Sequence, residues 1–157
     1  MHVAIIFGSS SDEQTMAKAA RQLDELGITY EAFIASAHRV PDLLDQILED
    51  VQARGAKVII AGAGLAAHLP GVIASKVTIP VIGVPLTGAV AGLDALLSIV
   101  QMPKGIPVAT VGIDNAANAA MLAASILSVS DREIRTAIEQ YRQTTAANFS
   151  TTPVKLA

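Results

Sequence analysis

The chain has 157 residues, of which 52% are hydrophobic, only 3% are aromatic and 16% are charged, and its formal net charge is -3 at pH 7. This length fits a single domain over residues 1–157, and we expect a core built from Ala, Val, Ile and Leu. The charges form no basic stripe for a nucleic-acid backbone, and a chain without cysteine has no disulfide, thiolate metal site or thiol nucleophile.

The first half of the chain alternates short apolar runs with amphipathic stretches. This pattern predicts elements in the following order: a strand at residues 3–7, a helix at 12–26, a strand at 30–35, a helix from Pro41 to just before Gly55, a strand at 57–61, a short helix at 67–75 and a strand at 80–84.

The second half continues the same alternation after a polar, glycine-containing loop that follows Pro85. It predicts a helix at residues 93–100, a strand at 108–111, an alanine-rich helix at 115–127 and an amphipathic C-terminal helix at 131–146. Residues 148–157 contain few packing side chains, so we expect a mobile tail.

Strands and helices that alternate five times predict right-handed crossovers and a parallel sheet covered on both faces. The predicted fold class is α/β, a three-layer αβα, flavodoxin-like doubly wound arrangement with five parallel strands. Such sheets bind ligands beyond the carboxyl ends of their strands. Three polar or glycine-rich loops are expected at that edge, at residues 8–12, 36–39 and 62–68.

The loop after the first predicted strand reads Gly8-Ser9-Ser10-Ser11-Asp12. Its glycine allows a tight turn, its serines offer hydroxyl donors, and the following helix N-terminus points N–H groups outward, which suits an anion. Alternatively, Ser11 or Asp12 only caps the helix. The Walker lysine and the G-x-G-x-x-G spacing are absent, which argues against a nucleoside triphosphate or a dinucleotide.

His38 and Arg39 follow the second predicted strand. A guanidinium binds phosphate bidentately, and an imidazole moves protons near neutral pH. Such a dipeptide is usually a solvated surface pair, but this one lies beside the serine loop in the predicted fold. We therefore assign phosphate recognition to Arg39 and general acid or base catalysis to His38.

Gly64, Ala66 and Ala67 form a wall with almost no side chains, which lets a flat ring approach the backbone, although tight packing explains this composition equally well. His68 either contacts a ligand or supports the loop, and His2 is expected in solvent. The three histidines are far apart and lack the spacing of metal ligands, so we expect no metal.

The apolar runs do not indicate a membrane protein, because each is interrupted well short of the ~20 residues that a spanning helix needs. Met1 leads into an apolar run without a preceding basic region or a cleavage pattern, so we expect no export signal. The sequence therefore predicts a cytoplasmic protein.

Five motifs stand out by their order and spacing. They read Gly8-Ser9-x-Ser11-Asp12, Ser36-Ala37-His38-Arg39-x-Pro41-Asp42, Gly62-Ala63-Gly64-x-Ala66-Ala67-His68-Leu69-Pro70-Gly71, Gly83-Val84-Pro85, and Leu97-Ser98-Ile99-Val100-Gln101-Met102-Pro103-x-Gly105. Together they resemble the PurE family of 5-(carboxyamino)imidazole ribonucleotide mutases, from Val3 to about Leu127.

The resemblance implies an isomerase of purine biosynthesis that needs no cofactor, metal or ATP. It implies that the substrate's carboxyamino group is released as carbon dioxide, which the ring carbon then attacks, with His38 as the proton carrier. It also implies a homo-octamer with active sites near subunit contacts, where residues 101–103 help to close a site. The substrate-binding residues that we predict are Ser9, Ser11, Asp12, Ser36, Arg39, Gly64, His68 and Leu69.

Three places depart from the family pattern: Leu65 replaces an expected glycine, Thr87-Gly88 replaces a polar pair, and Lys104 occupies a variable position. Leu65 affects the expected shape of the pocket that holds the imidazole base of the substrate. None of them touches the predicted phosphate site or His38.

Two other functions stay open at this point. Relatives that carboxylate aminoimidazole ribonucleotide directly resemble Ser-Ala-His-Lys where this chain has Arg39, which favours the mutase over that carboxylase. A non-catalytic nucleotide-phosphate-binding module needs the serine loop and Arg39 but gives no role to His38.

Overall fold

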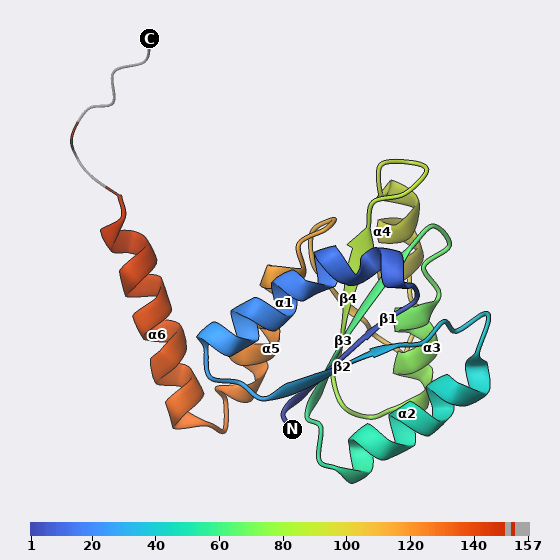
Figure 1. Ribbon diagram of the computed structural model, residues 1–157, viewed down its shortest axis with the longest axis horizontal. Coiled ribbons are helices and arrows are strands. Elements are labelled where there is room, and N and C mark those ends of the chain that lie inside the picture. Colours follow the sequence, from blue (N-terminus) through green and yellow to red (C-terminus); the bar gives the residue numbers. More distant parts are fainter. Residues whose placement is uncertain (150–151, 153–157) are drawn as a thin grey trace.

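The computed structural model describes residues 1–149 and 152. Its centre is a five-stranded parallel sheet in the order β2-β1-β3-β4-β5, which confirms the predicted flavodoxin-like arrangement (Figure 1). The strands are β1 (Val3–Phe7), β2 (Tyr30–Ile34), β3 (Val58–Gly64), β4 (Val81–Leu86) and β5 (Ala109–Thr110).

Helices cover both faces of the sheet (Figure 1). One face carries α1 (Glu13–Glu25) and α5 (Ala116–Leu127), with α6 (Arg132–Ala147) packed on α5. The other face carries α2 (Pro41–Ala53), α3 (Leu69–Lys76) and α4 (Leu93–Val100). The two layers of helices and the sheet between them are the three predicted layers.

The central strand β1 divides its side chains between the two layers of helices. Val3, Ile5 and Phe7 pack toward α1 and α5, whereas Ala4 and Ile6 pack toward α2 and α3. All five are buried, and full burial of a large aliphatic side chain contributes about 1.5–3 kcal/mol. The alternation fixes the register of β1 and therefore the place where its loop emerges.

Two strands extend further than their sequence pattern indicates. β3 continues to Gly64 and β4 continues through Pro85 to Leu86, because Ala63 pairs with Pro85 and Gly64 with Leu86. Pro85 is tolerated because β5 pairs with β4 only at Ile82 and Gly83, so no ladder partner on that side needs its missing N–H. Correspondingly, β5 has two residues where the pattern predicts four.

Close packing brings α1 onto the sheet at a glycine. A methyl group at Gly62 would overlap the sulfur of Met16, so the absence of a side chain there allows the helix to approach β3. This contact sets the distance between α1 and the sheet, and with it the position of the loop that precedes α1.

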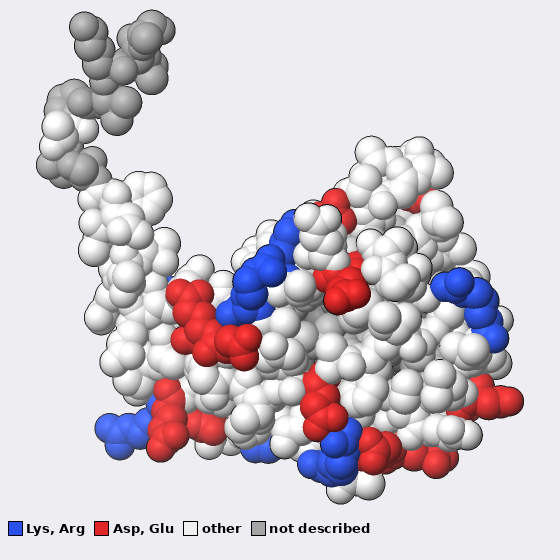
Figure 2. Space-filling model, in the orientation of Figure 1, with Lys and Arg blue, Asp and Glu red and all other residues white. Residues whose placement is uncertain are grey.

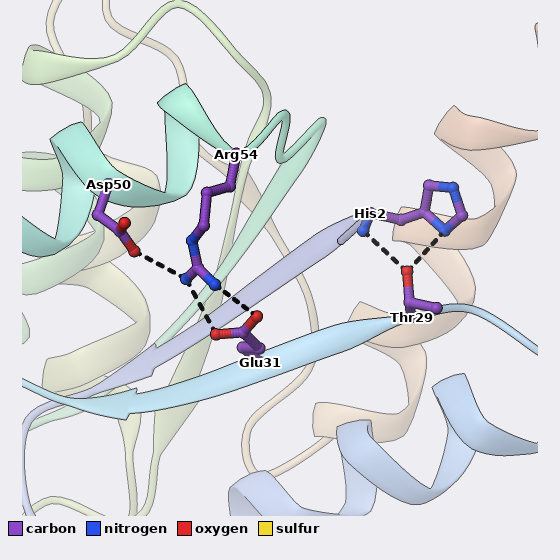
Figure 3. Close-up of polar contacts among 5 residues, drawn as sticks. All are labelled: His2, Thr29, Glu31, Asp50 and Arg54. Carbon is purple, nitrogen blue, oxygen red and sulfur yellow. Dashed lines mark hydrogen bonds and ion pairs between the residues drawn. The ribbon is translucent and has the colours of Figure 1, made fainter.

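Polar contacts gather at the opposite end of the sheet, away from the carboxyl ends of the strands (Figure 3). Arg54 binds both carboxylate oxygens of Glu31, at 2.7 and 2.9 Å, and lies 2.7 Å from Asp50. The hydrogen bond from Arg54 lowers the pKa of Glu31 from its ordinary value. At the N-terminus, the Nδ1 atom of His2 lies 3.1 Å from the hydroxyl of Thr29.

The C-terminal helix α6 is attached by few buried side chains. Only Ile134 and Ile138 are buried among its residues, and its last turns stand clear of the sheet and its other helices in Figure 1. The mobility predicted for the tail concerns residues that lie mostly outside those described. None of the helices in the described part of the chain is long and apolar enough to cross a membrane.

Candidate active site

A cavity of about 610 Å³ lies at the carboxyl ends of the strands. Loops that follow β1, β2, β3 and β4 line it, so four stretches distant in sequence meet there. Every catalytic or substrate-binding residue that the sequence predicts lies in this lining: His38, Ser9, Ser11, Asp12, Ser36, Arg39, Gly64, His68 and Leu69. Residues 101–103, which the resemblance places near a site, do not line this cavity.

The serine loop turns by a short 3-10 helix, residues 10–12, before α1 begins. The Ser9 hydroxyl oxygen caps this turn by accepting from the backbone N–H and from the hydroxyl of Ser11, at 3.3 and 2.9 Å. Asp12 is at the N-cap position of α1, but its side chain makes no capping hydrogen bond. The side-chain capping hydrogen bond at this turn therefore comes from Ser9 and not from Ser11 or Asp12.

Arg39 joins the second loop to the first. One of its guanidinium nitrogens donates to the carbonyl oxygen of Gly8 at 2.7 Å, and its backbone N–H donates to the Ser36 hydroxyl at 3.4 Å. The Gly8 contact uses one of the five N–H donors of a guanidinium. The Arg39 side chain is exposed toward the cavity, where its other donors suit a phosphate.

The carboxyl group of Asp12 lies in the same corner of the cavity. Desolvation by burial raises its pKa from the ordinary value, and this effect outweighs the hydrogen bonds from the Ser11 side chain and the Ser9 backbone and the charge of Arg39, which all lower the pKa. A carboxylate that has lost water in this way is well suited to accept hydrogen bonds from ligand hydroxyls.

His38 and His68 come from different loops and contact each other in the lining of the cavity. The Nε2 atom of His38 lies 2.7 Å from Nδ1 of His68, and the rings meet edge to face with centroids 4.8 Å apart. One of these two nitrogens must donate and the other must accept, so the tautomer of one ring sets that of the other. His68 therefore does more than support its own loop, because it orients the imidazole of His38.

The remaining wall is apolar and comes from the β3–α3 loop. Ala66 and Leu69 line the cavity there with Leu65, which adopts a left-handed backbone with φ of 54°. Ala67 is also left-handed, with φ of 33°. Non-glycine residues rarely adopt this conformation, so the loop holds a defined and strained shape.

The fourth part of the lining, residues 86–88, is missing from the predicted site. Asp114, from the turn before α5, holds it in place: its carboxylate accepts from the backbone N–H of Thr87 at 2.9 Å and from the Thr87 hydroxyl. The backbone N–H of Asp114 also donates to the Pro85 carbonyl at 2.9 Å. The polar loop after Pro85 was the available signal, but the sequence gives no indication of its partner 27 residues later.

Among the residues described, no group of three or more His, Asp or Glu side chains could hold a metal ion. The polar groups of the cavity are hydroxyls, a guanidinium, a carboxyl group and two imidazoles. This set can bind a phosphorylated ligand and transfer protons.

Comparison with known proteins gives consistent matches over most of the chain. A model of the family described as AIR carboxylase matches residues 2–148. The N5-carboxyaminoimidazole ribonucleotide mutase of Pyrococcus abyssi is 55% identical over 142 residues, covering 90% of this chain and 82% of the relative. The protein of the same name from Bacillus subtilis is 53% identical over 146 residues, covering 91% and 90%.

A solved structure extends this similarity to three dimensions. The crystal structure of Treponema denticola PurE superposes with a TM-score of 0.85 at 35% sequence identity. The match covers 92% of this chain and 91% of that chain.

Proposed function

The chain belongs to the AIR carboxylase family, and from this premise we propose how its cavity performs the reaction. It acts as an N5-carboxyaminoimidazole ribonucleotide mutase, an isomerase of purine biosynthesis. The observation that carries the assignment of residues is the His38–His68 contact of 2.7 Å, in the same cavity as Arg39 and the serine loop. A proton carrier and an anion site thus lie side by side.

The substrate's phosphate binds at the corner formed by Ser9, Ser11 and Arg39. These residues offer two hydroxyls and the guanidinium donors that Gly8 does not use. Asp12 accepts a hydrogen bond from the ribose, which compensates the desolvation of its carboxylate.

The imidazole ring of the substrate then extends from this corner toward His38. Ser36 and His68 supply polar contacts at its edge, whereas Gly64 and Leu69 supply the surface against which a flat ring lies. Glycine at position 64 lets the ring approach the backbone closely.

His38 carries the proton in both steps of the reaction. In the first, the bond between the exocyclic nitrogen and the carboxylate carbon breaks, carbon dioxide forms, and the nitrogen keeps the electron pair and takes a proton from His38. In the second, the ring carbon attacks carbon dioxide and its proton returns to His38. The imidazole ends as it began, and such general acid and base catalysis typically contributes ~10²–10⁴-fold.

The apolar wall supports this sequence because carbon dioxide is neutral and only shape can retain it. Ala66, Ala67 and Leu69 exclude water from that side of the cavity. No step of the proposed reaction uses ATP, a metal or another cofactor.

The test is turnover of purified protein with the carboxyamino substrate, without ATP. We expect conversion to the ring carboxylate. A protein that makes this product only from aminoimidazole ribonucleotide and dissolved carbon dioxide would be the direct carboxylase, and one that binds the nucleotide without turnover would be a binding module.

We also propose a homo-octamer in the cytoplasm. Support for assembly comes from α4, where Leu93, Leu97 and Val100 are 47–50% exposed at helical spacing, next to Val90 at 57%. Figure 2 shows few charged side chains over α4 and the loop before it, at the upper right. The number eight rests on the family resemblance alone.

A further inference from the structure

Leu65 occupies an unusual position at the rim of the cavity. Its side chain lines the cavity and is 57% exposed, although leucine is strongly apolar. Its backbone is left-handed, with φ of 54°, a conformation that favours glycine. A leucine in this backbone is strained, and its side chain lies at the cavity rim, so we look for the role of Leu65 at the cavity.

Gly88 faces Leu65 from the opposite loop. A methyl group built on Gly88 would lie 3.1 Å from the Cδ2 atom of Leu65 and 3.7 Å from its Cγ. The Leu65 side chain thus fills the space that a side chain at position 88 would use. Two of the three places at which the sequence departs from its family pattern, Leu65 and Thr87-Gly88, therefore lie side by side, and they bring the β3–α3 and β4–α4 loops together at the rim.

The loop that carries Gly88 is held at both ends by one turn of the chain. Asp114 binds Thr87 at its start, and the Ile113 side chain fills the space beside Gly92 at its end. Gly88 therefore lies in a loop held at both ends, and Leu65 packs beside it. Its own backbone is not left-handed, so a side chain at position 88 is limited by Leu65 and not by φ.

We propose that Leu65, closing against Gly88, determines how much of the carbon dioxide formed in the cavity is retained for attack by the ring carbon. The inference rests on the proposed function, in which cleavage of the nitrogen–carbon bond leaves carbon dioxide and a protonated amine. Carbon dioxide then either forms the new carbon–carbon bond or leaves through the rim. A neutral molecule has no charge for Arg39 or His38 to hold, so the width of the rim sets the outcome.

The test follows the carboxylate carbon. Substrate labelled with ¹³C in its carboxyamino group is converted in unlabelled bicarbonate, and mass spectrometry gives the fraction of product that keeps the label, with an enzyme-free blank subtracted. Wild type is expected to keep most of the label. Leu65→Gly, which relieves the left-handed strain, is expected to lose label several-fold more often, and Leu65→Ala to fall between them.

A second variant separates retention from any general damage. Gly88→Val in the Leu65→Gly background restores an apolar side chain at the rim from the opposite loop, so label retention should recover. Equal retention in wild type and Leu65→Gly, complete exchange in wild type, or no recovery in the double variant would overturn the inference. Absence of any product from wild type would instead refute the proposed function, and with it the carbon dioxide to be retained.

Discussion

The Nε2 atom of His38 lies 2.7 Å from the Nδ1 atom of His68, although the two residues are 30 positions apart and come from loops after different strands. This contact fixes the ring of the proposed proton carrier while leaving its Nδ1 atom for a substrate or a water. It also links the tautomers of the two rings, because one of the two nitrogens donates and the other accepts.

We expect His38→Asn to abolish turnover while the fold and the substrate affinity change little. The amide keeps much of the size and one hydrogen bond, but it cannot carry a proton, so the loss should reach at least the ~10²–10⁴-fold typical of general acid and base catalysis. Steady-state kinetics and calorimetry measure the two quantities. His2→Asn, at the far end of the sheet, is the matched control, and near-normal activity of His38→Asn would refute the mechanism.

His68→Phe should lower kcat more than it raises KM, because we expect His68 to orient His38. A hydrogen bond of this kind contributes about 0.5–1.5 kcal/mol, so the decrease should be roughly two- to tenfold. His68→Asn, which can still donate or accept, should recover part of the rate. A change confined to KM would assign His68 to substrate binding alone.

Arg39→Ala should weaken substrate binding with little effect on stability. Its side chain is exposed, and its charged hydrogen bonds to a phosphate typically contribute about 1.5–3 kcal/mol. Isothermal calorimetry measures the affinity, and Arg39→Lys, which keeps the charge but loses the bidentate geometry, should fall between wild type and the alanine variant. Unchanged affinity would make Arg39 a structural link to Gly8.

Asp12→Asn tests whether the carboxylate of Asp12 contributes to the stability of the fold or is present for contact with a ligand. Because burial raises the pKa of Asp12 above 3.8, the native state binds more protons than the unfolded state just above that pH, and the free energy of unfolding falls as pH rises through this range. The variant should therefore be slightly more stable than wild type at neutral pH, and equally stable below pH 3.8. Urea unfolding at several pH values measures this difference, and a less stable variant at pH 7 would contradict it.

Leu97→Glu should reduce assembly without unfolding the subunit. Leu97 is 47% exposed on α4, so a charge there disturbs an interface and not the core. Light scattering at micromolar concentration measures the mass, with Gln14→Glu, an added charge on the exposed side of α1, as the control. A wild-type protein that is fully active as a monomer would refute the octamer.

The fold could be predicted because its signals are local. Apolar periodicity located the strands and helices, and Pro41 begins α2 as its fixed φ favours. The ends of β3 and β4 could not be predicted, because glycine and proline in a sequence usually indicate the end of a strand. Pairing between Gly64 and Leu86 overrides that preference, and it connects two strands that α3 separates in the sequence.

The candidate site divides in the same way. Topology brings the loops after β1, β2 and β3 to one edge, so Ser9, His38 and His68 could be placed together before their distances were known. Thr87 and Asp114 could not, because an aspartate in a turn gives no sign of which distant backbone N–H it will accept from.

The pairing of β1 has a consequence for the order in which a growing chain can build this enzyme. Val3 pairs with Val58, so the first strand synthesised stays without one of its neighbours until some fifty residues more have been made. The cavity is assembled from its serine loop onward, and the wall at Gly88 joins it only when Asp114 has left the ribosome. A nascent chain can thus contain His38 and the residues of the phosphate corner well before Leu65 and Gly88 can form the rim of the cavity.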